Sequence, residues 1–141
     1  MVRINYIQIL VLASVLFFLL YSSLGFTQDS TPVVAKMSED GVQRAEIIVD
    51  SYSFKPNHII VEVNKPVEIT LKSVTMVIPH NFTINHPEAG MNIDQSISHG
   101  EDVIVKFTPT KTGSFDFYCN KKGIFGSHRK KGMEGVIEVK G

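Results

Sequence analysis

Two segments of the sequence carry side chains that can donate to a soft metal ion. Cys119, the single cysteine, is followed after residues 120–127 by His128, and Met133 comes shortly afterwards. Thiolates and thioethers select copper and imidazoles accept it, whereas zinc sites use thiolate, imidazole and carboxylate ligands. The fourth donor has to come from another part of the chain, and His80, which opens a separate predicted strand, is the candidate. These residue types predict one metal site built from two segments.

Two histidines and one cysteine with a weak axial methionine form the ligand set of blue-copper electron-transfer sites. A protein that holds such a set in one geometry lets the metal change its oxidation state with little rearrangement. We therefore predict one copper ion, cycling between Cu(I) and Cu(II), bound by His80, Cys119, His128 and Met133. Glu134 is the alternative to Met133, because it offers a hard oxygen donor at the next position.

The N-terminus has the three parts of a secretory signal peptide. Met1–Gln8 carries the cation Arg3, Ile9–Leu20 is almost wholly apolar, and Tyr21–Gly25 is small and polar. We predict a signal peptide over residues 1–25. An uncleaved membrane anchor is the alternative, because the apolar run approaches the minimum length of a spanning helix. Both interpretations place the remaining chain outside the cytoplasm, either periplasmic or secreted.

Export makes the lone Cys119 informative. Exported domains use cysteines mainly in disulfide pairs, and a free thiol in an oxidising compartment is exposed to oxidation. A single cysteine in such a chain has to pair between chains, stay free or bind a ligand. The last of these agrees with the predicted metal site.

Strand signals dominate the rest of the sequence. Residues 26–40 are polar, contain a proline and predict a flexible N-terminal arm. Beyond them, runs such as residues 67–72 and 103–107 alternate between apolar and polar side chains and are separated by turn residues. Residues 87–98 contain few apolar side chains and are expected to form a loop. Seven to eight short strands without a helical period predict an all-β domain, a Greek-key β-sandwich, over residues 41–141.

Three motifs resemble those of the cupredoxin family, in particular its plastocyanin-like and azurin-like blue copper proteins. Pro79–Phe82 (PHNF) is similar to the motif around the family's N-terminal ligand histidine. Gly113–Cys119 (GSFDFYC) is similar to the strand that delivers the cysteine, and Gly132–Val136 (GMEGV) to the loop that carries the axial methionine. The resemblance spans about residues 42–141. It implies a β-sandwich with one copper ion near one end.

The resemblance also implies that Asn81 ties the His80 segment to the Cys119 loop, which is the kind of outer contact that orients metal ligands. One feature departs from the family: residues 120–127 make the connection between Cys119 and His128 longer than in familiar members. Loop closure becomes costly only slowly with length, so the site can still form. A perturbed blue, green or red copper centre is therefore an alternative to a regular blue one.

The connection between Cys119 and Met133 contains five cations and no acid, and its tip is apolar. An apolar patch ringed by positive charge beside a ligand histidine suits brief docking of an acidic redox partner, because charge steers the encounter. A solvated loop with a core-facing phenylalanine is the alternative. The predicted docking residues are Lys121, Lys122, Ile124, Phe125, Arg129, Lys130 and Lys131.

Charge and site composition limit the function classes. A formal net charge of zero argues against a nucleic-acid-binding protein. The sequence predicts a monomeric copper protein that carries single electrons between redox proteins, with membrane contact only if the N-terminal segment is uncleaved. Periplasmic copper storage or delivery is the alternative. An enzyme is not expected, because copper oxidases and reductases need a second copper site or an open coordination position.

Overall fold

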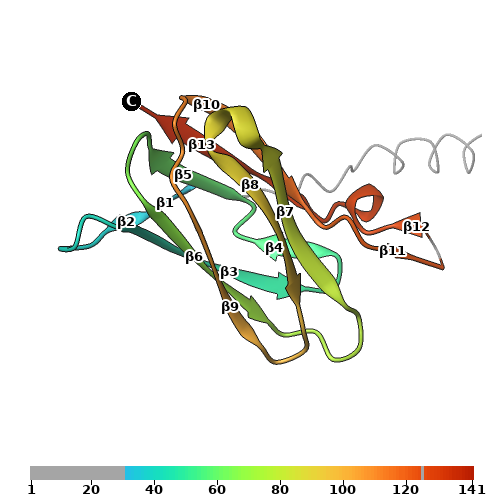
Figure 1. The fold of residues 1–141 in the computed structure, drawn as a ribbon. Coiled ribbons are helices and arrows are strands. Elements are labelled where there is room, and N and C mark those ends of the chain that lie inside the picture. The colour runs from blue at the N-terminus through green and yellow to red at the C-terminus, as the bar shows by residue number, and fades with distance from the viewer. Residues whose placement is uncertain (1–30, 125) are drawn as a thin grey trace, which may run out of the picture.

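The computed structural model describes residues 31–124 and 126–141, and its strands form two stacked sheets (Figure 1). One sheet has six strands in the order β1, β5, β13, β10, β7 and β8. Its strands are β1 (Val33–Val34), β5 (His58–Glu62), β7 (His80–His86), β8 (Met91–Ile97), β10 (Gly113–Tyr118) and β13 (Glu134–Lys140).

The second sheet has the order β2, β3, β6 and β9, with β4 paired to β3. Its strands are β2 (Lys36–Met37), β3 (Gln43–Asp50), β4 (Ser53–Lys55), β6 (Val67–Ser73) and β9 (Asp102–Phe107). This architecture confirms the predicted all-β sandwich. The described residues contain thirteen strands, more than the seven to eight predicted, because short strands lie at the sheet edges and in a separate two-stranded hairpin.

The core lies between the sheets, because alternate residues of each strand point inward. In β6 the side chains of Val67, Ile69 and Leu71 are buried, and the residues between them are partly exposed. β6 runs antiparallel to β9, where Val67 pairs with Phe107 and Leu71 with Val103. Burial of each of these side chains stabilises the fold by about 25 cal/mol for every Å² of apolar surface removed from water. The period of two in the sequence therefore corresponds to the inner face of the sandwich.

Three buried phenylalanines join the two sheets next to the candidate metal site. The rings of Phe54 on β4 and Phe117 on β10 are 5.3 Å apart, and those of Phe82 on β7 and Phe117 are 4.8 Å apart. His80 lies two residues before Phe82, and Cys119 lies two residues after Phe117. Because side chains two positions apart share a face of a strand, both candidate ligands point into the same interior.

Residues 26–40, predicted as a flexible arm, contain two short strands that pair with the sheets. β1 pairs in parallel with β5, and β2 pairs antiparallel with β3, so residues 33–37 contact both sheets. Between the two strands, Ala35 is buried and its N–H donates to the carbonyl of Ile60 at 2.9 Å. The prediction of a flexible arm is therefore wrong for residues 33–37, whose backbone pairs with a strand of each sheet.

Residues 87–98 are also not the expected loop. They form a short 3₁₀ helix, η1 (Pro87–Ala89), and then β8, which pairs with β7 from Met91 opposite His86 to Ile97 opposite His80. β8 is the last strand of its sheet. An edge strand tolerates polar side chains, because one of its sides faces solvent, and this explains the weak strand signal in the sequence.

The connection between Cys119 and His128 folds into a hairpin. It consists of β11 (Lys122–Gly123) and β12 (Gly126–Ser127), followed by the 3₁₀ helix η2 (Arg129–Lys131). The hairpin extends from the end of the sandwich that lies away from the C-terminus (Figure 1).

The predicted signal peptide, residues 1–25, lies outside the described residues, as does Phe125. Among residues 31–124 and 126–141, no helix has the length and apolar character needed to cross a membrane.

Candidate metal centre

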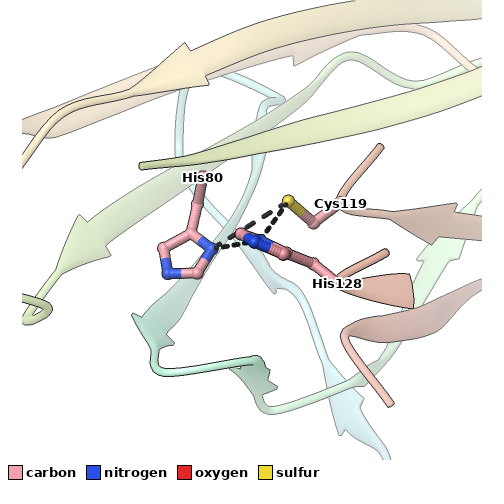
Figure 2. Close-up of side chains that lie close together, drawn as sticks. All are labelled: His80, Cys119 and His128. Carbon is pink, nitrogen blue, oxygen red and sulfur yellow. Dashed lines mark hydrogen bonds between the residues drawn. The ribbon is translucent and has the colours of Figure 1, made fainter. Parts of the chain in front are cut away.

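Three candidate ligands meet at the hairpin end of the sandwich, as Figure 2 shows. His80 is the first residue of β7, Cys119 directly follows β10, and His128 follows β12. The sulfur of Cys119 lies 3.9 Å from Nδ1 of His80 and 3.4 Å from Nδ1 of His128, and the two Nδ1 atoms are 3.3 Å apart. All three residues are buried. Antiparallel pairing of β7 with β10 brings together residues that are far apart in the sequence.

The spacing of these donor atoms fits one metal ion. Ligand bonds of about 2.0–2.3 Å in a trigonal arrangement separate nitrogen and sulfur donors by roughly 3.5–3.7 Å. The observed separations of 3.3–3.9 Å bracket that value. Both imidazoles present Nδ1 to the thiol, and the set of one thiolate and two imidazoles matches the equatorial ligands of blue-copper sites. The three side chains can therefore hold a single copper ion.

Backbone hydrogen bonds fix the relative positions of these segments. The N–H of Cys119 donates to the carbonyl of Met133 at 3.1 Å, and the N–H of Met133 donates to the carbonyl of His128 at 3.1 Å. Met133 is fully buried and is thus tied to the segments of two candidate ligands. Met133 as the axial ligand remains a prediction.

Glu134, the alternative to Met133, faces away from the site. Its carboxylate accepts a 2.8 Å hydrogen bond from Arg129, and both side chains are about half exposed at the surface. The geometry favours Met133 over Glu134 as the fourth donor.

Asn81 lies where the family resemblance places it. Its backbone N–H donates to the sulfur of Cys119 at 3.5 Å, and its side-chain oxygen accepts a 2.8 Å hydrogen bond from the N–H of Asn120. Its side-chain amide donates to Thr83 at 2.9 Å and to the carboxylate of Asp94 on β8. Asn81 thus connects β7, β8 and the residue after Cys119. A tuning role at a metal site is a further step and remains a prediction.

Burial sets the protonation of the three donors. Burial, together with the nearby His128, lowers the pKa of His80 to about 4. Burial also lowers the pKa of His128, and Lys131 and Lys121 act in the same direction. Burial raises the pKa of Cys119, although the hydrogen bond from the Asn81 backbone opposes this rise. Near neutral pH the imidazoles are therefore free bases ready to bind a metal, and the thiol has to release its proton when it does.

Comparison with known proteins identifies the family. The sequence model of the Cupredoxin-like domain matches residues 10–136, most of the chain. This chain belongs to the cupredoxin-like family. The resemblance seen in the motifs is thereby confirmed. No curated protein matches the sequence significantly.

Solved structures share the fold at low sequence identity. The metal-binding domain of the Streptococcus pneumoniae D39 Cu(I) exporting P-type ATPase CopA aligns with a TM-score of 0.64 and 22% identity, over 79% of this chain and 98% of that one. Auracyanin A, a "blue" copper protein from Chloroflexus aurantiacus, aligns with a TM-score of 0.55 and 20% identity, over 71% and 100%. A chain of a heme-copper terminal oxidase dimer aligns with a TM-score of 0.54 and 19% identity, over 95% of each chain. These likenesses show a common fold.

Sequence reasoning missed Tyr52, whose ring covers the histidines of this cupredoxin, and the contact that Lys131 makes with that ring. The ring of Tyr52 packs edge-on against His128, with centroids 4.9 Å apart, and against His80 at 6.3 Å. The ammonium group of Lys131 lies 3.9 Å from the centroid of the Tyr52 ring. Tyr52 comes from the turn between β3 and β4, remote in sequence from the ligand motifs, and no local signal marks it.

The predicted docking residues differ in their exposure and in the partners of their side chains. Lys122, Ile124 and Lys130 are exposed, and Ile124 is 96% exposed. Lys121 is half-buried. Arg129 donates to Asp116 at 2.7 Å and to Glu134 at 2.8 Å, so its charge is already paired. The remaining two are Lys131, which lies over Tyr52, and Phe125, which is outside the described residues.

A second apolar surface was not anticipated. Val74, Met76 and Val77 are all exposed, in the connection that leads into β7 and therefore directly before His80. A pocket of about 360 Å³ lies beside this connection, and its lining includes Val77, Pro79, His80, Ser98, His99 and Lys121. The run VTMVIP at residues 74–79 was the available signal, because its apolar side chains have no alternation that would bury them.

Proposed function

We propose that this cupredoxin is an exported electron carrier that binds one copper ion through His80, Cys119, His128 and Met133. The observation that supports it best is the convergence of two Nδ1 atoms and one sulfur, 3.3–3.9 Å apart, in a buried site. A copper ion bound there supplies one-electron redox chemistry, accepting an electron from a donor protein and passing it to an acceptor.

The chain's own contribution is a preset and water-poor ligand geometry. His80 stands at the start of a fully paired strand, and the Cys119 segment is held by hydrogen bonds to Met133 and Asn81. The lowered pKa of both imidazoles keeps them unprotonated at neutral pH. Since these supports do not depend on the oxidation state, the donors keep their positions through a redox cycle. Rapid electron exchange requires that the ligands move little when the oxidation state of the metal changes.

Partner docking is proposed at the same end of the molecule. Lys122, Lys130 and Ile124 on the hairpin side, and Met76 and Val77 on the other, present positive charge and apolar surface close to the candidate ligands. Charge of this sign favours a partner with an acidic docking face, and the exposed apolar side chains suit a brief contact.

Reversible redox chemistry tests the proposed function. The purified protein would be loaded with Cu(II), and its visible spectrum followed through a redox titration, with Cys119→Ser as the matched variant. The proposal predicts a thiolate-to-copper absorption band that bleaches on reduction and returns on oxidation, and that is absent in Cys119→Ser. A green or red centre would keep the copper assignment and indicate that the long hairpin or the axial ligand alters the site. Tight Cu(I) binding without a reversible band would contradict electron transfer.

Copper storage or delivery is the second candidate. Its support is the likeness to the metal-binding domain of a Cu(I) exporting ATPase, which shares the fold at 22% identity. A delivery protein would bind Cu(I) selectively and release it to an acceptor, so selective Cu(I) transfer favours this candidate over the first. Among the described residues, one group of three or more potential metal ligands was found, His80, Cys119 and His128, which suits a carrier of a single copper ion.

A further inference from the structure

Tyr52 occupies a backbone position that a tyrosine rarely adopts. It is the second residue of the two-residue turn between β3 and β4, whose flanking residues Asp50 and Ser53 are paired. Its φ is +59°, in the left-handed region that favours glycine and asparagine. Strain of this kind persists where surrounding contacts hold it and is often found at functional sites. The contacts that hold Tyr52 in this conformation therefore indicate which functional site it belongs to.

Those contacts are with the two histidines of the candidate metal centre. The Tyr52 ring stands at 87° to the ring of His128 and at 90° to the ring of His80. Edge-to-face packing at these centroid distances is a favourable aromatic arrangement. The left-handed turn thus directs the tyrosine over both imidazoles, so that it restricts their rotation and covers them against water.

Lys131 reaches the same tyrosine from the 3₁₀ helix η2. The helix η2 begins directly after His128, and the N–H of Lys131 donates to the carbonyl of His128 at 3.0 Å. This turn places the ammonium group 3.9 Å from the centroid of the Tyr52 ring, within the range of a cation–π interaction. A lysine that follows a candidate ligand by three residues is in this way held next to the metal centre.

We propose that Tyr52 and Lys131 form a cap that positions the two histidines and raises the reduction potential of the bound copper. This inference rests on the proposed copper site. Reduction lowers the positive charge of the centre by one, so a fixed cation nearby disfavours the oxidised state more than the reduced state. The aromatic ring fixes the cation and limits the access of water to the imidazoles. A charge held at a fixed position close to a buried centre acts on it more strongly than a mobile charge farther away on the surface. Tyr52 acts here as a positioning residue and Lys131 as a fixed charge.

The first experiment compares reduction potentials in a double-mutant cycle. Lys131→Gln is expected to lower the potential relative to the unmodified protein. Tyr52→Leu is expected to lower it as well and, because the cation loses its platform, to reduce the effect of adding Lys131→Gln. Tyr52→Phe retains the ring and should retain the potential more closely than Tyr52→Leu.

Lys130→Gln is the matched control, since it removes the same charge from the same turn. Lys130→Gln should shift the reduction potential less than Lys131→Gln does. Its shift should also be the same in the unmodified protein and in the Tyr52→Leu variant. The proposal is overturned if the two lysine variants shift the potential equally, or if the Lys131→Gln shift is undiminished in the Tyr52→Leu background.

A copper-free measurement separates this inference from the proposed function. In the metal-free protein, the ring current of Tyr52 should move the NMR signals of the Lys131 Cε protons upfield. The shift should persist in Tyr52→Phe and disappear in Tyr52→Leu. Absence of the shift in the unmodified protein overturns the cap. The ring-current shift could also be present in a protein that shows no reversible copper chemistry. That result would support the contact between Tyr52 and Lys131. It would overturn their role in tuning the reduction potential and contradict the proposed function.

Discussion

The side-chain oxygen of Asn81 accepts a 2.8 Å hydrogen bond from the backbone N–H of Asn120, the residue next to Cys119. Asn81 itself follows His80, so one side chain links the neighbours of two candidate ligands that are 39 positions apart. The same residue donates to Asp94 on β8. Loss of this side chain would therefore remove both its hydrogen bond to the Cys119 segment and its hydrogen bond to β8.

Asn81→Ala should destabilise the metal-free protein by about 1–3 kcal/mol, the cost of leaving buried hydrogen-bond partners unsatisfied. Chemical denaturation measures this change. Asn85→Ala is the control, because Asn85 lies on the same strand with its side chain exposed, and its effect should stay within about 0.5 kcal/mol. Equal effects of the two substitutions would contradict the linking role of Asn81.

Gly135→Ala should destabilise the fold by crowding the core. A Cβ atom at Gly135 would lie 2.4 Å from the ring of Phe117 and 2.3 Å from the carbonyl oxygen of Asn57. Overpacking of this kind costs about 1–3 kcal/mol. At Gly123 the nearest atom to an added Cβ is 3.8 Å away, so Gly123→Ala serves as the tolerated control. Urea midpoints of the two variants compare them. An undiminished stability of Gly135→Ala would show that both Phe117 and the Asn57 backbone can move aside.

The stability of the metal-free protein should fall on acidification. Burial lowers the pKa of His80 from 6.5 to about 4, so the unfolded state binds more protons than the folded state between these values. Stability therefore rises with pH across this window and is lost as the pH falls from about 6.5 toward 4, by at most about 3 kcal/mol from this residue. The lowered pKa of His128 acts in the same direction.

Urea unfolding of the metal-free protein at several pH values between 4.5 and 7.5 measures this dependence. His80→Gln removes the titrating group and should flatten the profile over that range. An equally steep profile in His80→Gln would assign the acid sensitivity to other groups.

Charge reversal on the hairpin side should alter reactions with small charged redox reagents. Lys121→Glu combined with Lys122→Glu should slow oxidation by anionic ferricyanide about tenfold at low ionic strength and speed oxidation by a cationic cobalt(III) complex. Lys36→Glu with Lys111→Glu makes the same charge change on exposed residues outside the predicted docking set and should change these rates less. Equal rate changes in the two double variants would exclude the hairpin side as the site of approach.

The three donors that the structure brings together could be predicted from the sequence, because their residue types alone mark them as metal ligands. Cys119, His128 and His80 carry donor atoms that few other side chains offer, and the strand periods around them predict which face they share. The sandwich followed from the alternation in strands such as β6 and β9, whose inner faces are mainly apolar.

Features that depend on tertiary contacts could not be predicted in this way. β8 carries polar side chains because it lies at a sheet edge, and residues 33–37 are held by backbone pairing that leaves little trace in side-chain pattern. The pairing of Arg129 with Asp116 crosses from η2 to β10, so a count of cations in the loop overstated the available charge. Tyr52 reaches the histidines only because its turn adopts a left-handed backbone.

A titration of the metal-free protein with Cu(II), followed by visible absorption, tests the central claim most directly. We predict an intense thiolate-to-copper band that grows linearly and stops at one equivalent of copper, as expected for a single site formed by His80, Cys119 and His128. A protein that gains no such band, or one whose band survives in Cys119→Ser, would contradict the copper centre proposed here.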